Sequence, residues 1–262
     1  ENLAKSQKPK LLIIGTTAYP LILYCKRLGE IAYAIDAWLV ADVSHVAGLI
    51  LSDVYPSPVP YCHIVTTTIH KTLRGPRGAM IMVTSKGVKK DPELPAKINR
   101  AVFPGLQGGP HNNVTAAVAQ ALIEADTKEF REYGKQIVLN AKLLAELLRK
   151  GGLTIVTGKT ECHLIVVDLR PLGVSGSVIA QALEDAGIIV NKNSVPNDSA
   201  SPFRPSGIRL GTPAVTTRGM KEKEMKMIAK WILEVVNNPT DGKLQQRISQ
   251  EVKNLCKKFK CP

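Results

Sequence analysis

Residues 65–78 hold the side chains of this chain that are best suited to carry out chemistry. They read Val-Thr-Thr-Thr-Ile-His-Lys-Thr-Leu-Arg-Gly-Pro-Arg-Gly, so Lys71 follows a β-branched run and a histidine. The run predicts a buried strand over 65–68, and the glycines and proline predict a loop after it. Flanking cations, Arg74 and Arg77, disfavour the ammonium form of Lys71 and favour the free amine that forms a Schiff base. The alternative interpretation is a solvated lysine at a strand end.

An acidic residue ends a second apolar run. The sequence Trp-Leu-Val-Ala-Asp-Val-Ser-His over residues 38–45 predicts a buried strand that ends at Asp42, with His45 shortly after it. A carboxylate in that place is costly to bury without a cationic partner. The protonated ring nitrogen of pyridoxal phosphate is such a partner, and the pairing makes the ring an electron sink. Asp42 and Lys71 together therefore predict that this cofactor is bound at two places, whereas Asp42 alone is equally explained as a capping acid.

The segments around these residues resemble serine hydroxymethyltransferases. Similar segments follow in that family's order, between about residue 9 and about residue 237: ADVSHVAG at 41–48, TTTIHK at 66–71, FPGLQGGPH at 103–111, NKNSVPND at 191–198 and SGIRLGTP at 206–213. A set of motifs in register is far more specific than a single short one. The resemblance implies a fold-type-I enzyme that depends on pyridoxal 5'-phosphate. Such an enzyme interconverts serine and tetrahydrofolate with glycine and 5,10-methylenetetrahydrofolate.

The resemblance also implies roles for residues around the cofactor. Lys71 is the residue that forms the Schiff base, and Asp42 pairs with the pyridine nitrogen. His45 lies beside the phenolic oxygen and the carboxyl-binding region, and His70 lies on the phosphate side. Thr17 occupies the place of a cofactor-contacting serine and keeps its hydroxyl.

Substrate and subunit contacts are implied in the same way. Arg209 binds the substrate carboxylate, for which a planar guanidinium is well suited, and Asn193 lies in the folate pocket. Arg77 positions the loop around the site. Gly108 and Gly109 approach the cofactor phosphate of a neighbouring subunit, where backbone amides come close without a side chain intervening. The expected assembly is a homodimer or homotetramer.

Thr68 completes the expected catalytic set, which otherwise contains Lys71, His70 and Arg209. The resemblance makes Thr68 the candidate for tuning proton transfer beside the cofactor bond. The alternative is a β-branched residue that merely fills a strand end.

The chain departs from the family pattern at several positions outside the expected contacts. Ile69 replaces a threonine, Gly29 an arginine, Asp36 a glycine and Asn113 a histidine, and Glu-Cys at 161–162 replaces Asp-Asn. We also expect the family's N-terminal portion to be absent from this sequence, which leaves the isolated chain with negligible serine-cleaving activity. The alternatives are a threonine-aldolase-like enzyme that uses the same cofactor and a non-catalytic paralogue or scaffold.

Composition narrows the class of protein further. The 262 residues are 44% hydrophobic and 22% charged, which is typical of a globular protein of two domains. No apolar run approaches the length that spans a bilayer. The scattered cysteines predict reduced thiols and no metal site in a cytoplasmic protein, with the mitochondrial matrix as the alternative. The net charge of +13 comes without a nucleic-acid-binding motif, so we expect most of the lysines to lie on solvated helix faces. The alternative for part of the charge is attraction of anionic substrates.

The elements that must position these residues follow from periodicity. An α/β domain with a mostly parallel sheet is predicted over 1–130 and an α+β domain over 131–262. Strands are expected at 10–15, 38–42, 64–68, 79–84, 153–157, 164–169 and 187–190. Helices are expected at 21–36, along 114–122 with Asn112 or Asn113 as N-cap, along 137–148 with the glycines at 151–152 ending it, at 176–185, and along 225–235 and 244–255.

Overall fold

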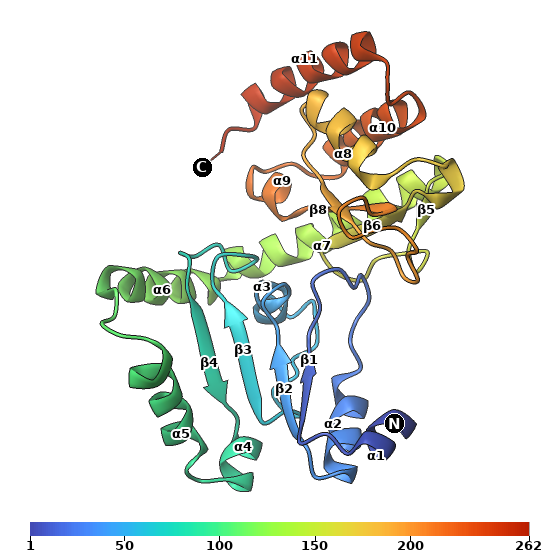
Figure 1. Ribbon diagram of the computed structural model, residues 1–262. Helices are drawn as coiled ribbons and strands as arrows, with labels where there is room; N and C mark the ends of the chain where they lie inside the picture. Colours follow the sequence, from blue (N-terminus) through green and yellow to red (C-terminus); the bar gives the residue numbers. More distant parts are fainter. Residues whose placement is uncertain (262) are drawn as a thin grey trace. The chain divides into compact units, whose positions relative to one another are not determined.

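The computed structural model describes residues 1–261, which divide into two compact units (Figure 1). The first unit holds Glu1–Thr17 and Ile22–Glu132, and the second holds Ala18–Leu21 and the chain from Tyr133 onward. The short segment Ala18–Leu21 groups with the second unit because the Pro20 carbonyl accepts hydrogen bonds from the backbone N–H of Glu161 (2.8 Å) and from Thr160 Oγ1 (3.2 Å).

A four-stranded sheet organises the first unit, in the order β1 (Leu11–Ile14), β2 (Trp38–Asp42), β3 (Ile64–Thr68) and β4 (Ala79–Val83). The first three strands run parallel, and β4 runs antiparallel to β3 with Thr68 opposite Ala79. The mostly parallel sheet predicted for this part of the chain is therefore confirmed. Parallel strands end at the same edge of a sheet, so the chain leaves β1, β2 and β3 at one edge, where β4 also begins.

Helices and connecting segments surround this sheet (Figure 1). They are α1 (Asn2–Gln7), α2 (Cys25–Ala34), α3 (Ala47–Leu51), α4 (Ser85–Lys90), α5 (Leu94–Arg100), the irregular helical segment η1 (Ala101–Leu106) and α6 (Asn112–Ala125). Leu39, Ala41 and Val65 point to the same face and are almost completely buried. The apolar run at 10–15 predicts a short buried strand, but β1 is an edge strand in which Ile13 is 69% exposed.

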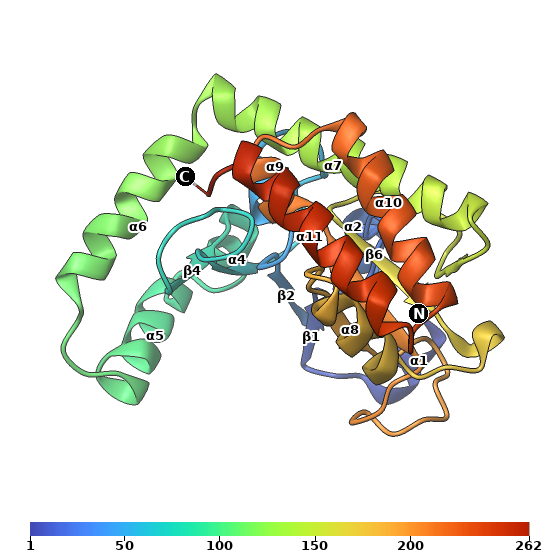
Figure 2. The same ribbon diagram turned by 90° about the horizontal axis from the view of Figure 1, so that it is seen from above.

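The second unit has an antiparallel sheet in the order β5 (Thr154–Ile155), β6 (Leu164–Asp168), β8 (Gly207–Gly211) and β7 (Asn191–Asn193). Its helices are α7 (Lys128–Lys150, in which the boundary between the units falls), η2 (Arg170–Leu172), α8 (Gly176–Asp185), α9 (Pro213–Thr217), α10 (Glu222–Asn237) and α11 (Gly242–Lys258). Figure 2 shows α10 and α11 side by side. Ile165, Val167 and Ile208 are fully buried beneath the helices and form the centre of the hydrophobic core.

Several element boundaries differ from the prediction. The strand expected at 187–190 is not formed, because Gly187 adopts φ 80° and Ile188 donates its backbone N–H to Leu183, which terminates α8. The paired strand is the next segment, Asn191–Asn193. The strand expected at 153–157 is reduced to Thr154–Ile155.

The starts of two helices were also predicted wrongly. The helix expected from residue 21 begins at Cys25, because the backbone N–H of Leu23 is held by Tyr55 Oη at 3.0 Å. Helix α6 begins at Asn112 after His111 as N-cap, and no side-chain capping hydrogen bond forms, so neither Asn112 nor Asn113 is the cap.

No helix within residues 1–261 is long and apolar enough to cross a membrane. The same residues contain no group of three or more His, Cys, Asp or Glu side chains that could hold a metal ion.

Candidate functional site

The carboxyl ends of the three parallel strands bring the main candidate residues to one edge of the first sheet. Gly15 follows β1 with φ +149°, and a Cβ on it would lie 2.4 Å from the backbone oxygen of Asp42. Only glycine permits this close backbone approach at that φ. The exit of β1 therefore passes directly over the end of β2.

Asp42 presents an exposed carboxylate at the end of β2. Its Oδ1 accepts the backbone N–H of Ser44 at 2.9 Å, which fixes the side chain against the following turn. In the described part of the chain, no second hydrogen bond and no cation reaches this carboxylate. Asp42 is thus oriented by the protein but keeps acceptor capacity for a ligand.

Two side-chain hydroxyls tie the loop after β2 to the loop after β3. Ser44 Oγ accepts the backbone N–H of Thr68 at 3.0 Å. Thr72 Oγ1 accepts the backbone N–H of Gly48 at 3.0 Å and donates to the carbonyl of His45 at 3.2 Å. These hydroxyls hold the segment with Asp42 and His45 against the segment with Lys71.

Lys71 lies half-buried in a tight turn after β3. The Arg74 N–H donates to the Lys71 carbonyl at 3.0 Å, and the Gly75 N–H donates to the Ile69 carbonyl at 3.0 Å. Arg74 adopts φ 57° in this turn, and its guanidinium lies 5.5 Å from the centre of the Phe130 ring. No acidic side chain among residues 1–261 forms an ion pair with Lys71, so its amine is available to a ligand.

The residues just before Lys71 carry buried polar atoms that have no partner. Thr68 Oγ1 and His70 Nδ1 are both inaccessible to solvent, and neither makes a hydrogen bond within residues 1–261. Leaving such atoms unpaired is costly, and native proteins rarely do so without a reason. Both atoms belong to the three residues before Lys71, and the open carboxylate of Asp42 ends the adjacent strand. Together these residues supply donors and acceptors of the kind that a polar, phosphate-bearing ring requires. The residues present therefore fit pyridoxal phosphate.

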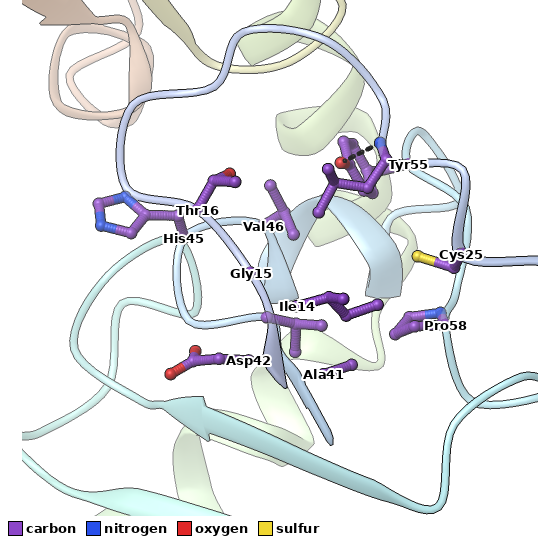
Figure 3. A pocket seen from close by; sticks show the side chains of 12 residues that line it. Ile14, Gly15, Thr16, Cys25, Ala41, Asp42, His45, Val46, Tyr55 and Pro58 are labelled. Atoms are coloured by element: carbon purple, nitrogen blue, oxygen red, sulfur yellow. Dashed lines mark hydrogen bonds between the residues drawn. The ribbon is translucent and has the colours of Figure 1, made fainter. Parts of the chain in front are cut away.

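A small cavity lies behind the ends of β1 and β2 (Figure 3). The Asp42 carboxylate and the His45 ring lie on one side of it, and Cys25, Tyr55 and Pro58 line the opposite side. Its volume of about 20 Å³ is room for a single water molecule. This cavity is therefore too small to hold a cofactor ring.

Four other candidates of the first unit lie apart from these contacts. Thr17 follows β1 in an exposed loop, and Arg77 is exposed between the Lys71 turn and β4. Gly108 and Gly109 lie in the exposed segment between η1 and α6, and a Cβ on either would meet no atom within 4 Å. The two glycines are not required by packing within the described chain.

The second unit holds the two remaining candidates on adjacent strands. Arg209 in β8 pairs with Asn191 in β7, and its Nη2 donates to Asn191 Oδ1 at 3.1 Å. Burial lowers the pKa of Arg209. Asn193 ends β7, and its Nδ2 donates to the Ser194 carbonyl at 2.6 Å.

The structure thus gathers Asp42, His45, Thr68, His70 and Lys71 in the first unit, and Asn193 and Arg209 in the second. Sequence reasoning did not identify the residues that hold the first group together: Gly15, Ser44, Gly48 and Thr72. All but Gly15 lie inside or directly beside the motifs. Their type alone gives no sign that they bridge two loops.

Comparison with known proteins shows the family of this chain. A sequence profile described as serine hydroxymethyltransferase matches residues 1–232. A serine hydroxymethyltransferase of Acidothermus cellulolyticus is 49% identical over 267 aligned residues, which cover 100% of this chain and 61% of the relative. One of Sorangium cellulosum is also 49% identical, over 100% of this chain and 60% of the relative. The chain spans about three fifths of the length of these relatives. It belongs to the serine hydroxymethyltransferase family of fold-type-I enzymes.

Proposed function

We propose that this chain carries the cofactor-lysine part of an enzyme that transfers a one-carbon unit between serine and tetrahydrofolate. The products in one direction are glycine and 5,10-methylenetetrahydrofolate, and the cofactor is pyridoxal 5'-phosphate. The observation that carries the proposal is the segment 68–71, in which Thr68 Oγ1 and His70 Nδ1 are buried without a hydrogen-bond partner and Lys71 has no acidic partner within residues 1–261. Family membership supports the same reaction, and it favours neither a threonine aldolase nor a scaffold.

The residues at the sheet edge have distinct tasks in this proposal. Lys71 binds the cofactor covalently through its amine. Asp42, oriented by Ser44, holds a proton on the ring nitrogen. The bound cofactor supplies an electron sink for the carbanion that forms at the amino-acid substrate. His70 supplies a hydrogen bond on the phosphate side, and Thr68 holds or passes a proton next to the Lys71 amine.

Further contacts are proposed for the remaining candidates. Thr17 donates its hydroxyl to the cofactor, His45 lies beside the phenolic oxygen, and Arg77 positions the loop around the site. Arg209 binds the substrate carboxylate through two parallel hydrogen bonds, a geometry that a guanidinium matches. Asn193 binds the folate.

A homodimer is part of the proposal, with a homotetramer as the larger alternative. Gly108 and Gly109 bring backbone amides to the cofactor phosphate of the neighbouring subunit, and the empty space around both glycines supports this placement. Sedimentation velocity distinguishes the states, and a strictly monomeric chain that still binds the cofactor contradicts the shared site. We propose a cytoplasmic location, with the mitochondrial matrix as the alternative, and cell fractionation separates the two.

The lysine assignment is tested by reconstitution with pyridoxal phosphate. The wild-type chain should develop the absorbance band of the protein-bound cofactor, and borohydride reduction should leave a stable mass label on the peptide with Lys71. Lys71→Ala should abolish both signals. The control is Lys89→Ala, which removes an exposed lysine of α4 and should leave both unchanged. A label on another lysine, or a band that survives Lys71→Ala, would refute the assignment.

A further inference from the structure

The loop at residues 194–206 joins β7 to β8 and carries no helix or strand. The two strands form a hairpin in which Asn193 pairs with Gly207 and Asn191 pairs with Arg209. A long irregular loop inside a compact unit is uncommon, and it is usually a binding element when it is well ordered. What orders this loop is therefore informative.

One carboxylate, that of Asp198, links the two arms at the base of the loop. Asp198 Oδ2 accepts the backbone N–H of Val195 at 3.3 Å and of Ser206 at 2.9 Å. Asp198 Oδ1 accepts the backbone N–H of Ala200 at 3.0 Å and the hydroxyl of Ser206 at 2.7 Å. Val195 belongs to the outgoing arm and Ser206 to the returning arm. The Asp198 side chain thus links both arms where they leave the sheet.

Other contacts act nearer the tip of the loop. The carbonyl of Phe203 accepts long bonds from Lys192 Nζ at 3.3 Å and from Ser177 Oγ at 3.5 Å, and the Phe203 side chain is 83% exposed. Shorter backbone bonds run from the Arg204 N–H to the Ser201 carbonyl at 2.8 Å and from the Gly176 N–H to the Pro205 carbonyl at 2.7 Å. Among the side chains of the loop, however, Asp198 is the one that connects the outgoing arm to the returning arm through several bonds.

The hairpin register decides where the two candidate binding residues point. Asn191 and Asn193 lie two residues apart on β7 and therefore share a face. Arg209 is directly opposite Asn191, so its side chain lies on the same face as both asparagines. A slip of one residue would turn the whole set to the other face. β7 has only three residues and therefore few pairs of its own, so contacts between the two arms at the base of the loop add to what holds the register.

We propose that Asp198 is a positioning residue that fixes the register of the β7–β8 hairpin, so that Asn193 and Arg209 present one binding surface. The inference rests on the proposed function for the identity of the ligands, a substrate carboxylate and a folate. The ordering of the hairpin itself does not depend on it. A carboxylate is required because all four contacts are donors, and asparagine has one acceptor oxygen and a donor in place of the second.

The ordering is tested with Asp198→Asn in the full chain. Backbone N–H groups of Val195, Ala200 and Ser206 should exchange with solvent at least about tenfold faster than in the wild type, and chymotrypsin should cleave after Phe203 at a similarly increased rate. The matched control is Asp185→Asn, which removes the same charge from the same unit at a side chain bonded only to Gln181. It should change neither rate.

Ser206→Ala gives an independent check if Asp198→Asn folds poorly. It deletes the hydroxyl bond and keeps the backbone bond at 2.9 Å. Its effect on exchange and cleavage should be smaller but confined to the same loop. Cleavage spread over the whole chain, or exchange rates equal to those of Asp185→Asn, overturns the proposed ordering.

The positioning role is tested by the side-chain NMR signals of Asn193 and Arg209 and by calorimetric binding of tetrahydrofolate. Asp198→Asn should shift both signals and weaken binding about tenfold, while the Tm of the chain changes little. Unshifted signals or unchanged affinity overturn the role. If the wild-type chain fails to bind tetrahydrofolate, that result counts against the proposed function, and the NMR signals alone then decide the role of Asp198.

Discussion

The hydroxyl of Thr72 joins the two loops of the candidate site by accepting the Gly48 N–H at 3.0 Å and donating to the His45 carbonyl at 3.2 Å. The backbones meet so closely here that a Cβ on Gly48 would lie 2.5 Å from the Thr72 carbonyl oxygen. Lys71 is the neighbour of Thr72 in the chain. Any change that separates Gly48 from Thr72 therefore moves Lys71 relative to His45.

Gly48→Ala should destabilise the protein by about 3 kcal/mol, because the added methyl group collides with backbone that cannot give way. Urea unfolding of the apo chain measures the loss. Gly108→Ala is the control, since a Cβ there meets nothing within 4 Å, and its free energy of unfolding should change by less than about 0.5 kcal/mol. Equal stability of the two variants would show that the loops separate without cost.

Ser44→Ala should cost about 1–3 kcal/mol, since it leaves the backbone N–H of Thr68 without its acceptor in a half-buried site. It should also weaken the binding of pyridoxal phosphate, because the Ser44 hydroxyl holds the end of β3 at Thr68 against the loop that follows Asp42. Thermal unfolding and cofactor titration measure the two effects. Ser57→Ala removes a half-buried hydroxyl that accepts one long bond, from Val59 at 3.3 Å, and should match the wild type in both.

Asp36→Gly should leave the stability within about 0.5 kcal/mol of the wild type. Asp36 adopts φ 54°, which favours glycine, but its carboxylate pairs with Lys90 at 2.7 Å. That carboxylate is 94% exposed, so the ion pair adds little. Asp36→Val should instead cost about 1–2 kcal/mol, because a β-branched residue is strained at positive φ. A stable valine variant would contradict the assigned backbone conformation.

His63 makes stability depend on pH near neutrality. Its Nδ1 accepts the backbone N–H of Leu39 at 2.9 Å, which requires that nitrogen to be unprotonated. Burial lowers the pKa of His63, and the charges of Lys90 and Lys86 lower it further, against a smaller opposite effect of Asp36. The ring also lies 5.1 Å from that of Trp38.

The folded protein therefore binds a proton at His63 less readily than the unfolded chain. The contribution of His63 to stability should be complete above the pKa of the unfolded chain, about 6.5. It should be lost as the pH falls from there towards the lower pKa of His63 in the folded protein. We expect Tm to decrease between about pH 7 and pH 5. His63→Asn keeps an acceptor near the Leu39 N–H and should flatten this decrease. An equally steep profile in the variant would assign the pH dependence to another group.

The sequence by itself determined the residue types of the site and the strands that carry them. Residues 38–42 and 64–68 form strands as predicted because apolar and β-branched runs set local structure. Lys71 follows β3, and Asp42 ends β2, as the order of the residues required. Helix 176–185 was also predicted correctly, since Ser175 caps it through a contact three residues away.

Only the tertiary structure decided which segments meet. The bonds of Ser44 to Thr68 and of Thr72 to Gly48 join segments that are far apart in the sequence, and the bond of Asp198 to Ser206 joins the two arms of one loop. No local sequence pattern encodes these bonds. The segment 187–190 has the composition of a strand, yet its backbone is used to end α8. Periodicity reports which face of an element is apolar, whereas register, loop closure and backbone contact depend on how the elements pack together.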